Sequence, residues 1–320
     1  MSGIVDVLVL YEHPEWQKPL FAALERRGVS YATLDLKRAA FDPTALPAAR
    51  VVFNQASPSA YVRGHDRAVP LARALLRTYE ANGTRVINGH DAFSLELSKS
   101  AQLALLAKLD VRAPRSLVFD DVDALGAQLV STDFPFPALV KPDQGGSGAR
   151  MFEVASLDEV RTVCSDPQQW TPDPVMLLQE KLPYDNDFGI VRLEVLGGEL
   201  LYAMRVVSHG AFNLCPSEVC NPTEGTGACA LPPLDAPPPP KVEFYPYPEV
   251  PDRAVHQALA VAKAGGLDVA GLEYAEVGGE PVFYDVNANS NLRPAIGEAF
   301  GFDPFDRVVS YLVSEVARTR

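Results

Sequence analysis

A short segment near the C-terminus, residues 283–289, carries an acid and an amide two positions apart within a largely apolar run. In a β-strand, side chains at positions i and i+2 point to the same face of the sheet. Asp285 and Asn287 therefore offer oxygen atoms on one face of a predicted buried strand. Mg²⁺ prefers such ligands and is often bound together with substrate phosphates. The alternative is a loop, in which the two side chains form turn or capping hydrogen bonds.

A second apolar run, residues 269–274, lies upstream and carries a single acid, Glu273. If this run forms the neighbouring strand, the carboxylate of Glu273 can approach that of Asp285. We therefore predict that Glu273, Asp285 and Asn287 together bind a divalent metal ion.

A glycine-rich turn follows a third apolar run, residues 138–142, which contains Lys141. Residues 145–148 read Gly-Gly-Ser-Gly, and glycines let backbone N–H groups approach an anion closely. No helical pattern follows, so the segment is neither of the common phosphate-binding loops that precede a helix. Residues 151–154 instead predict a returning strand. The turn is therefore either an ordinary hairpin or a hairpin that covers phosphates.

The order of these segments resembles the ATP-grasp superfamily, whose members include glutathione synthetases, D-alanine:D-alanine ligases and ribosomal-protein glutamate ligases. Lys99 precedes Lys141 and the glycine-rich hairpin, residues 175–182 form an apolar strand that ends in Gln-Glu-Lys-Leu, and the acids of the predicted metal site come last. The resemblance covers residues 86–316. It implies an ATP-grasp fold preceded by an N-terminal domain.

The resemblance also implies roles for individual residues. The implied nucleotide contacts are Lys99 and Lys141 on the phosphates, Gly145, Gly146, Ser147 and Gly148 in a loop closing over them, Gln179, Glu180, Lys181 and Leu182 in the hinge beside adenine, and Asp187 or Asp185 on the ribose. The implied metal ligands are Glu273, Asp285 and Asn287. The implied residues near the γ-phosphate or the substrate are Arg205 and Asn213. Arg293, six positions after Asn287, is a further candidate for a cation on the substrate side.

The function implied by the resemblance is an ATP-dependent ligase that joins a carboxylate to an amine through an acyl phosphate. ATP and Mg²⁺ would be required, with two ions expected and Mn²⁺ as a substitute. The substrates would be small molecules, namely amino acids or peptides. Two alternatives remain: an ATP-grasp phosphotransferase, and a non-catalytic module that only binds nucleotide.

Two stretches depart from the pattern of the superfamily. Ile190 stands where several relatives have an acid two residues before Arg192, which weakens the ribose assignment. Residues 289–294 read Asn-Ser-Asn-Leu-Arg-Pro where many relatives have Asn-x-x-Pro-Gly. Because that stretch shapes the substrate pocket in the relatives, the acceptor substrate cannot be transferred from them.

Composition is that expected of a soluble cytoplasmic enzyme. The chain has 320 residues, 47% of them hydrophobic, without an apolar run long enough for a membrane span and without a basic start typical of a signal peptide. Its formal net charge of −13 argues against a general nucleic-acid binder, which would present basic stripes. A homo-oligomer is compatible with the sequence.

Strands alternate with helices along the chain, which indicates an α/β protein. Residues 1–90 predict an N-terminal domain with a parallel sheet, residues 91–174 a small ATP-grasp lobe and residues 175–320 a large lobe. The predicted helices are 17–27, 68–81, 94–109, 251–264 and 303–318, and the predicted strands of the first domain are 5–10, 31–36, 51–53 and 85–87.

A proline-rich and cysteine-rich insertion, about 215–251, interrupts the large lobe near the expected substrate pocket. Cys215, Cys220 and Cys229 lie in it, with His209 nearby. The number of cysteines would allow a zinc site, but the spacing lacks a C-x2-C pair and favours reduced thiols.

Arg63 is a further candidate for binding a substrate carboxylate, because loops after strands of an open α/β sheet face the ligand crevice. The alternative is a surface arginine.

Overall fold

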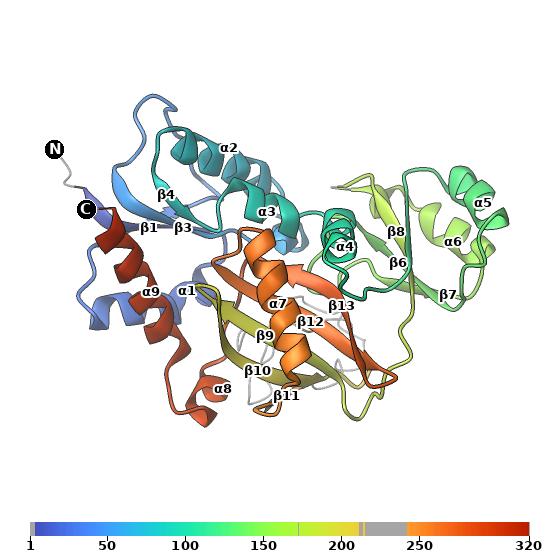
Figure 1. Ribbon diagram of the computed structural model, residues 1–320. Coiled ribbons are helices and arrows are strands. Elements are labelled where there is room, and N and C mark those ends of the chain that lie inside the picture. The colour runs from blue at the N-terminus through green and yellow to red at the C-terminus, as the bar shows by residue number, and fades with distance from the viewer. Residues whose placement is uncertain (1–3, 172, 211–213, 215–241, 320) are drawn as a thin grey trace, which may run out of the picture.

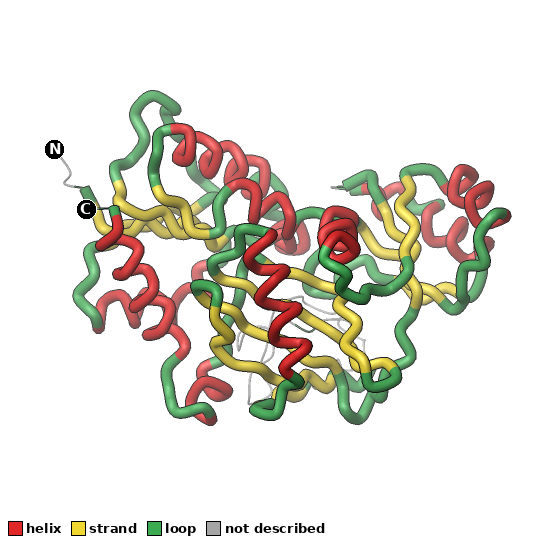
Figure 2. Tube along the Cα trace, viewed as in Figure 1, coloured by secondary structure: helices red, strands yellow, loops and turns green. Residues whose placement is uncertain are grey.

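The computed structural model describes residues 4–171, 173–210, 214 and 242–319, and these residues form three β-sheets (Figures 1 and 2). Asn213 and the cysteines Cys215, Cys220 and Cys229 lie outside the described residues. The fold is mixed α/β, as predicted. Within the described part, no helix is both long and apolar enough to span a membrane.

The N-terminal sheet is parallel, in the order β2-β1-β3-β4, which confirms the parallel sheet predicted for residues 1–90. Successive side chains of β1 and β3 enter two different cores because they alternate between the faces of the sheet. One core lies under α2, and the other lies under α1 and the C-terminal helix α9. The elements are β1 (Val5–Tyr11), α1 (Pro14–Arg26), β2 (Tyr31–Asp35), β3 (Ala49–Gln55), the 3₁₀ helix η1 (Pro58–Arg63), α2 (Ala68–Ala81), β4 (Arg85–Ile87) and α9 (Pro304–Arg318).

A small lobe lies at the opposite end of the molecule in Figure 1 and has a core of its own. Its sheet is antiparallel, in the order β5-β8-β6-β7, and β6 and β7 form the predicted hairpin around the glycine-rich turn. The elements are β5 (Ser116–Phe119), α5 (Val122–Val130), β6 (Ala138–Pro142), β7 (Phe152–Val154), α6 (Leu157–Cys164), the 3₁₀ helix η2 (Pro167–Trp170) and β8 (Met176–Glu180).

A five-stranded antiparallel sheet lies between these two parts, in the order β11-β10-β9-β12-β13, with α7 across one face (Figure 1). The predicted strands that carry Glu273 and Asp285 are the neighbours β12 and β13. The elements are β9 (Ile190–Leu196), β10 (Glu199–Val207), β11 (Glu243–Pro246), α7 (Asp252–Ala264), β12 (Val269–Val277), β13 (Glu280–Asn287) and α8 (Pro294–Ala299). β11 falls within the predicted insertion, which therefore contains an edge strand of this sheet.

The helix predicted over residues 94–109 is in fact two helices, α3 (His90–Glu96) and α4 (Lys99–Lys108). Ser98 lies between them in an extended conformation, and its hydroxyl accepts a hydrogen bond from the backbone N–H of Ala101 at 3.2 Å. A serine in this position caps a new helix N-terminus and stops the preceding helix. Lys99 is consequently the first residue of α4.

The sheets divide the chain at points other than the predicted boundaries at 90 and 174. β8 lies within the 175–320 range but belongs to the small-lobe sheet. The helices α3 and α4 lie in the 91–174 range, yet they pack on the core of the large-lobe sheet. The helix α9 ends the chain and packs on β1 and β3 of the N-terminal sheet.

A partly buried polar cluster joins the N-terminal sheet to the large lobe. Arg85 of β4 forms an ion pair with Asp268, which directly precedes β12, and donates to the carboxylate of Glu315 in α9 at 2.7 Å. The side-chain amide of Asn88 donates to the carbonyl of Val269 at 2.8 Å. These contacts hold the two parts together at the end where β12 begins.

The packing of α9 generates a test of this arrangement. Leu312 is fully buried in α9, and replacing it by alanine should lower the free energy of unfolding by about 2–5 kcal/mol, through lost burial and a residual cavity. Val313, the next residue, is 41% exposed, so Val313→Ala should change the free energy of unfolding by about 0.5 kcal/mol or less. Urea denaturation of both variants measures the difference. Equal stability of the two variants would contradict the packing of α9 on the N-terminal sheet.

Candidate active site

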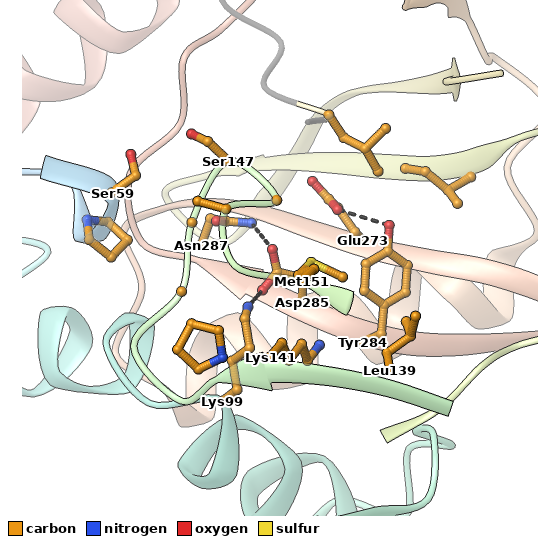
Figure 3. Close-up of a pocket in the computed structure, with 18 of the residues that line it drawn as sticks. Ser59, Lys99, Leu139, Lys141, Ser147, Met151, Glu273, Tyr284, Asp285 and Asn287 are labelled. Carbon is orange, nitrogen blue, oxygen red and sulfur yellow. Dashed lines mark hydrogen bonds and ion pairs between the residues drawn. The ribbon is translucent and has the colours of Figure 1, made fainter. Parts of the chain in front are cut away.

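A single pocket between the small-lobe sheet and the large-lobe sheet contains most of the site residues predicted from the sequence (Figure 3). A loop of the N-terminal domain closes one end of it. The predicted residues that the structure brings together here are Lys99, Lys141, Gly145, Gly146, Ser147, Gly148, Gln179, Glu180, Lys181, Leu182, Glu273, Asp285 and Asn287.

Lys99 and Asp285 form an ion pair inside this pocket, with side chains 12% and 20% exposed (Figure 3). Burial alone would raise the pKa of Asp285, but the neighbouring ammonium of Lys99 holds it below its ordinary value. Gln102, one turn further along α4, exchanges side-chain hydrogen bonds with the backbone of Val286 at 2.9 and 3.1 Å. Helix α4 is thereby fixed against the edge strand β13.

Lys141 is the second cation of the pocket and lies on β6. Its ammonium donates to the side-chain oxygen of Gln179 on β8 at 2.7 Å, and Gln179 in turn donates to the hydroxyl of Ser116 at 3.0 Å. Burial, reinforced by the positive charge of Lys99, lowers the pKa of Lys141 to about 7. The approach of an anion would favour the protonated form again.

Glu273 and Asp285 face each other in the register of β12 and β13, as predicted. Arg192 on β9 donates to one oxygen of Glu273 at 2.6 Å, and the hydroxyl of Tyr284 donates to the other at 2.9 Å. Burial raises the pKa of Glu273 despite the opposing charge of Arg192. Arg192 also donates to Glu194 at 2.6 Å, so that one guanidinium joins two buried carboxylates.

The donor set at the ends of these strands fits Mg²⁺, which takes one or two carboxylates and completes its shell with waters and phosphates. Glu273, Asp285 and Asn287 would hold it, and the side-chain amide of Asn287 already donates to Asp285 at 3.2 Å. The described residues contain no group of three or more His, Cys, Asp or Glu side chains that could hold a metal ion. The proposed set has two carboxylates and takes its third oxygen from the amide of Asn287. The cysteines of the alternative zinc site lie outside those ranges.

The glycine-rich turn lines the pocket and is anchored at its N-terminal flank. The side chain of Asp143 accepts from the backbone N–H of Ser100 at 2.6 Å, which ties the turn to the N-terminus of α4. Gly146 approaches the N-terminal domain so closely that a Cβ atom would lie 2.7 Å from the Cβ of Ser59. Gly148 has a φ of +65°, a left-handed conformation that glycine adopts without strain.

The other end of the pocket is apolar. Leu139 and Met151 line it from the small lobe, while Leu182, Ile190 and Ala275 line it from the large lobe. Apolar side chains from two sheets can pack on both faces of a flat ring. The backbone at the end of β8, which also lines the pocket, can pair with the polar edge of such a ring. The pocket therefore has an apolar end and a charged end.

No protein-family model and no curated protein sequence matches this chain. Solved structures do match it over nearly its whole length. The RimK domain ATP-grasp protein from Sphaerobacter thermophilus has 17% sequence identity and a TM-score of 0.69, over 96% of this chain and 98% of that chain. The ATP-grasp ligase PsnB, solved with a minimal precursor, has 18% identity and a TM-score of 0.64, over 97% and 98%. D-cycloserine synthetase DcsG has 15% identity and a TM-score of 0.68, over 98% and 100%.

The chain has the ATP-grasp fold. The predicted fold class is thus confirmed: the β5–β8 and β9–β13 sheets are the two lobes of the grasp, and the N-terminal parallel sheet precedes them. At these identities the likeness concerns the fold, and the roles of the individual residues remain predictions.

Three predicted residues lie away from the pocket. Arg205 follows Met204, which is opposite Arg192 in the sheet, so strand alternation turns Arg205 to the other face. There its guanidinium stacks over Phe188, 4.7 Å from the ring centroid. This placement does not support the predicted contact of Arg205 with the γ-phosphate or substrate.

Asp187 is exposed in the loop after β8, where its backbone N–H donates to Asp185 at 2.9 Å. Arg293 is buried beyond the lining residues, with its guanidinium carbon 4.2 Å from the ring centroid of Phe244. Neither position supports the predicted contact with ribose or substrate. Asn213 lies outside the described residues.

Arg63 is neither a free substrate-binding group nor a simple surface residue. Its guanidinium donates to both carboxylate oxygens of the buried Glu12, at 2.9 and 2.7 Å. The guanidinium carbon of Arg63 lies 4.5 Å from the ring centroid of Trp16. A third bond, 3.1 Å long, reaches the hydroxyl of Ser59, which lines the pocket. Arg63 thus fixes the loop that closes the pocket.

The sequence did not single out several residues that line the pocket, namely Trp16, Ser59, Glu96, Arg192 and Asn289. Arg192 could have been found, because a strand that carries an arginine and a glutamate at i and i+2 among apolar residues must pair them inside. The others come from loops and helix ends of three different segments. No local spacing connects those segments.

The ion network of Arg192 generates a second prediction. Arg192→Met keeps an unbranched side chain but leaves the buried carboxylates of Glu194 and Glu273 without their cation, which should cost about 3–5 kcal/mol of unfolding free energy at neutral pH. Glu273 already has a raised pKa, and removing Arg192 raises it further. The pKa of Glu273 in the folded variant then exceeds the pKa in the unfolded chain. The loss of unfolding free energy should therefore shrink as the pH falls towards the folded-state pKa of Glu273.

Urea denaturation of wild type and Arg192→Met at neutral and at acidic pH measures both effects. Arg205→Met is the matched control, because Arg205 stacks on aromatic rings at the opposite face of the same sheet and forms no ion pair with an acid of the described residues. A pH-independent difference between wild type and Arg192→Met would show that the network is not electrostatic.

Proposed function

We propose that this protein is an ATP-dependent ligase that joins a carboxylate to an amine and releases ADP and phosphate. The observation that carries the proposal is the convergence of Lys99 and Lys141 with Glu273, Asp285 and Asn287 at the charged end of one pocket. The ATP-grasp fold and the glycine-rich turn over the same end support it.

The chemistry of amide formation explains why such a site needs cations rather than a catalytic triad. A carboxylate resists attack by an amine, so one of its oxygens first attacks the γ-phosphorus and displaces ADP, which gives an acyl phosphate. The amine then attacks the carbonyl carbon, and phosphate departs with the former carboxylate oxygen. Lys99 and Lys141 would neutralise the oxygens of the moving phosphoryl group. The backbone of residues 145–148 would exclude water from the acyl phosphate.

ATP and Mg²⁺ are the proposed nucleotide and metal. PsnB has been solved with Mg and ADP and with AMPPNP, and this supports the same pair of ligands here. Mg²⁺ supplies positive charge against the phosphate oxygens when bound. We propose that Glu273, Asp285 and Asn287 hold two ions and that Mn²⁺ can replace them. The hinge residues 179–182 would receive adenine in the apolar end of the pocket.

The proposed substrates are an amino acid or peptide as the acid and a second molecule with a free amine. Structural neighbours support this class: PsnB was solved with a precursor peptide, and VanG is a D-Ala:D-Ser ligase with 14% identity and a TM-score of 0.68. A cytoplasmic location remains a prediction from the sequence, which is also compatible with a homo-oligomer.

Oxygen transfer tests the proposed reaction directly. A screen of amino acids and dipeptides for ADP release should identify an acid and an amine that react together. With that acid labelled by ¹⁸O in its carboxylate, the released inorganic phosphate should carry one labelled oxygen, because the label passes through the acyl phosphate. Mass spectrometry of the phosphate measures it.

The two alternatives give other results in the same assay. A phosphotransferase would leave a stable phosphorylated product and no free phosphate. A non-catalytic module would bind ATP without releasing ADP for any pair in the screen. Either result would overturn the ligase proposal.

Asp285→Asn tests the charged end of the pocket. The variant keeps the volume of the side chain and the strand but removes one negative charge. Turnover should fall by about a hundredfold or more, equivalent to about 3 kcal/mol, because charge on the moving phosphoryl is neutralised mainly in the transition state. Affinity for ATP should fall much less, since adenine and both lysines still bind it.

Glu276→Gln is the control, because Glu276 is an exposed acid on the same strand as Glu273. Its turnover and Mg²⁺ dependence should match the wild type. If Asp285→Asn instead lowers the melting temperature and leaves turnover and Mg²⁺ dependence near normal, Asp285 is a structural residue.

A further inference from the structure

Two buried acceptor oxygens at the charged end of the pocket are unused. They are Oε2 of Glu96 and Oδ1 of Asn289, and neither has a hydrogen-bond partner among the residues that the structure describes. Glu96 is only 5% exposed, and both residues line the pocket. Buried polar atoms are nearly always paired in folded proteins, so two adjacent exceptions inside a pocket indicate a ligand.

The remaining polar atoms of these two side chains fix their orientation. Oε1 of Glu96 accepts from the backbone N–H of Asn289 at 3.2 Å, which also shows that the two residues adjoin. The side-chain amide of Asn289 donates to the carbonyl of Ala56 at 3.0 Å. Because that carbonyl can only accept, the amide nitrogen must face it and the amide oxygen must face the other way.

Both residues lie directly beside the proposed site of phosphoryl transfer. Glu96 ends α3, three positions before Lys99, and Asn289 follows Asn287 by two positions. Ala56 begins the loop after β3 that continues into Ser59 at the pocket end. The pair thus joins the charged end of the pocket to the N-terminal domain.

The chemistry of the pair selects its ligand. When Glu96 is ionised, both free atoms are acceptors, and a ligand group that presents two or more hydrogens can satisfy both of them. A hydroxyl has one hydrogen and an N-acylated amine has one, whereas a protonated primary amine has three. The nearby carboxylates of Glu273 and Asp285 form ion pairs with Arg192 and Lys99, whereas no cation of the described residues forms an ion pair with Glu96.

We propose that Glu96 and Asn289 bind the amino group of the amine substrate and hold it next to the acyl phosphate. This assignment rests on the proposed ligase function. It implies that the acceptor substrate has a free primary amino group and that the same molecule with an acylated amine does not bind. The residues that recognise the amine then come from α3 and from the stretch after β13 in which this chain departs from the ATP-grasp pattern.

Calorimetric titration of the protein saturated with Mg²⁺ and AMP-PNP provides the test. The probes are methylammonium chloride, the standard amino acids and their N-acetyl derivatives. At least one free amine should bind the wild type, and its N-acetyl derivative should not. In Glu96→Gln the amine affinity should fall by about tenfold or more, the size expected for loss of a charge-assisted hydrogen bond, with AMP-PNP affinity unchanged.

Glu96→Gln retains an oxygen for the N–H of Asn289 and the volume of the side chain, so the variant should fold. Glu80→Gln is the matched control. The side chain of Glu80 also accepts a hydrogen bond from a backbone N–H, that of His90 at 2.8 Å, and His90 lies at the opposite end of α3 from Glu96. Glu80 does not line the pocket. It should bind the amine with wild-type affinity.

Four outcomes would overturn the assignment. Amine affinity that is unchanged in Glu96→Gln means that the two oxygens hold only a structural water. Equal binding of an amine and its N-acetyl derivative, or binding of AMP-PNP but of no amine in the panel, also rejects the amine site and leaves the ligase proposal to the oxygen-transfer experiment. Failure of AMP-PNP to bind the wild type rejects the ligase proposal itself, together with this assignment.

Discussion

Two carboxylates placed side by side on adjacent strands, Glu273 and Asp285, impose the arrangement of the rest of the site. Carboxylates this close and this buried repel each other unless each has a cation. Arg192 provides one from β9 and Lys99 provides the other from α4. The second pairing requires α4 to begin at Lys99 and to press against β13, and Ser98 and Gln102 satisfy that requirement by capping the helix and bonding the strand.

The sequence predicted those features that are encoded locally. Alternation along β12 and β13 placed Glu273, Asp285 and Asn287 on one face, and the glycine-rich turn predicted the hairpin of β6 and β7. The two lysines, by contrast, were assigned from the resemblance to a superfamily, because nothing in the spacing of Lys99 and Lys141 shows that helix α4 and strand β6 meet. Their convergence depends on contacts between segments far apart in the chain.

The failures have equally specific causes. Arg205 was predicted at the site, but side chains alternate along β10 and that of Arg205 points to the other face, towards Phe188. The position of a residue in a motif does not place its side chain unless the register of the strand is also known. The single helix predicted over 94–109 missed the cap at Ser98. The predicted boundary at 174 separated β8 from its sheet, because strand order within an antiparallel sheet is decided by pairing across the chain and not by sequence order.

Glu96 and Asp285 show how the pKa values of two carboxyl groups in one pocket can shift in opposite directions. Desolvation raises the pKa of Glu96 well above its ordinary value, whereas Lys99 holds the pKa of Asp285 below its own in spite of burial. Lys99 forms an ion pair with Asp285, whereas no cation of the described residues forms one with Glu96, where burial outweighs the charges of Arg192 and Lys99. Asp285 is therefore charged before any ligand arrives, as a phosphate-side metal ligand must be. A cation that reaches the free oxygen of Glu96 favours the charged form of its carboxyl group, so binding of an ammonium group there is coupled to loss of the carboxyl proton.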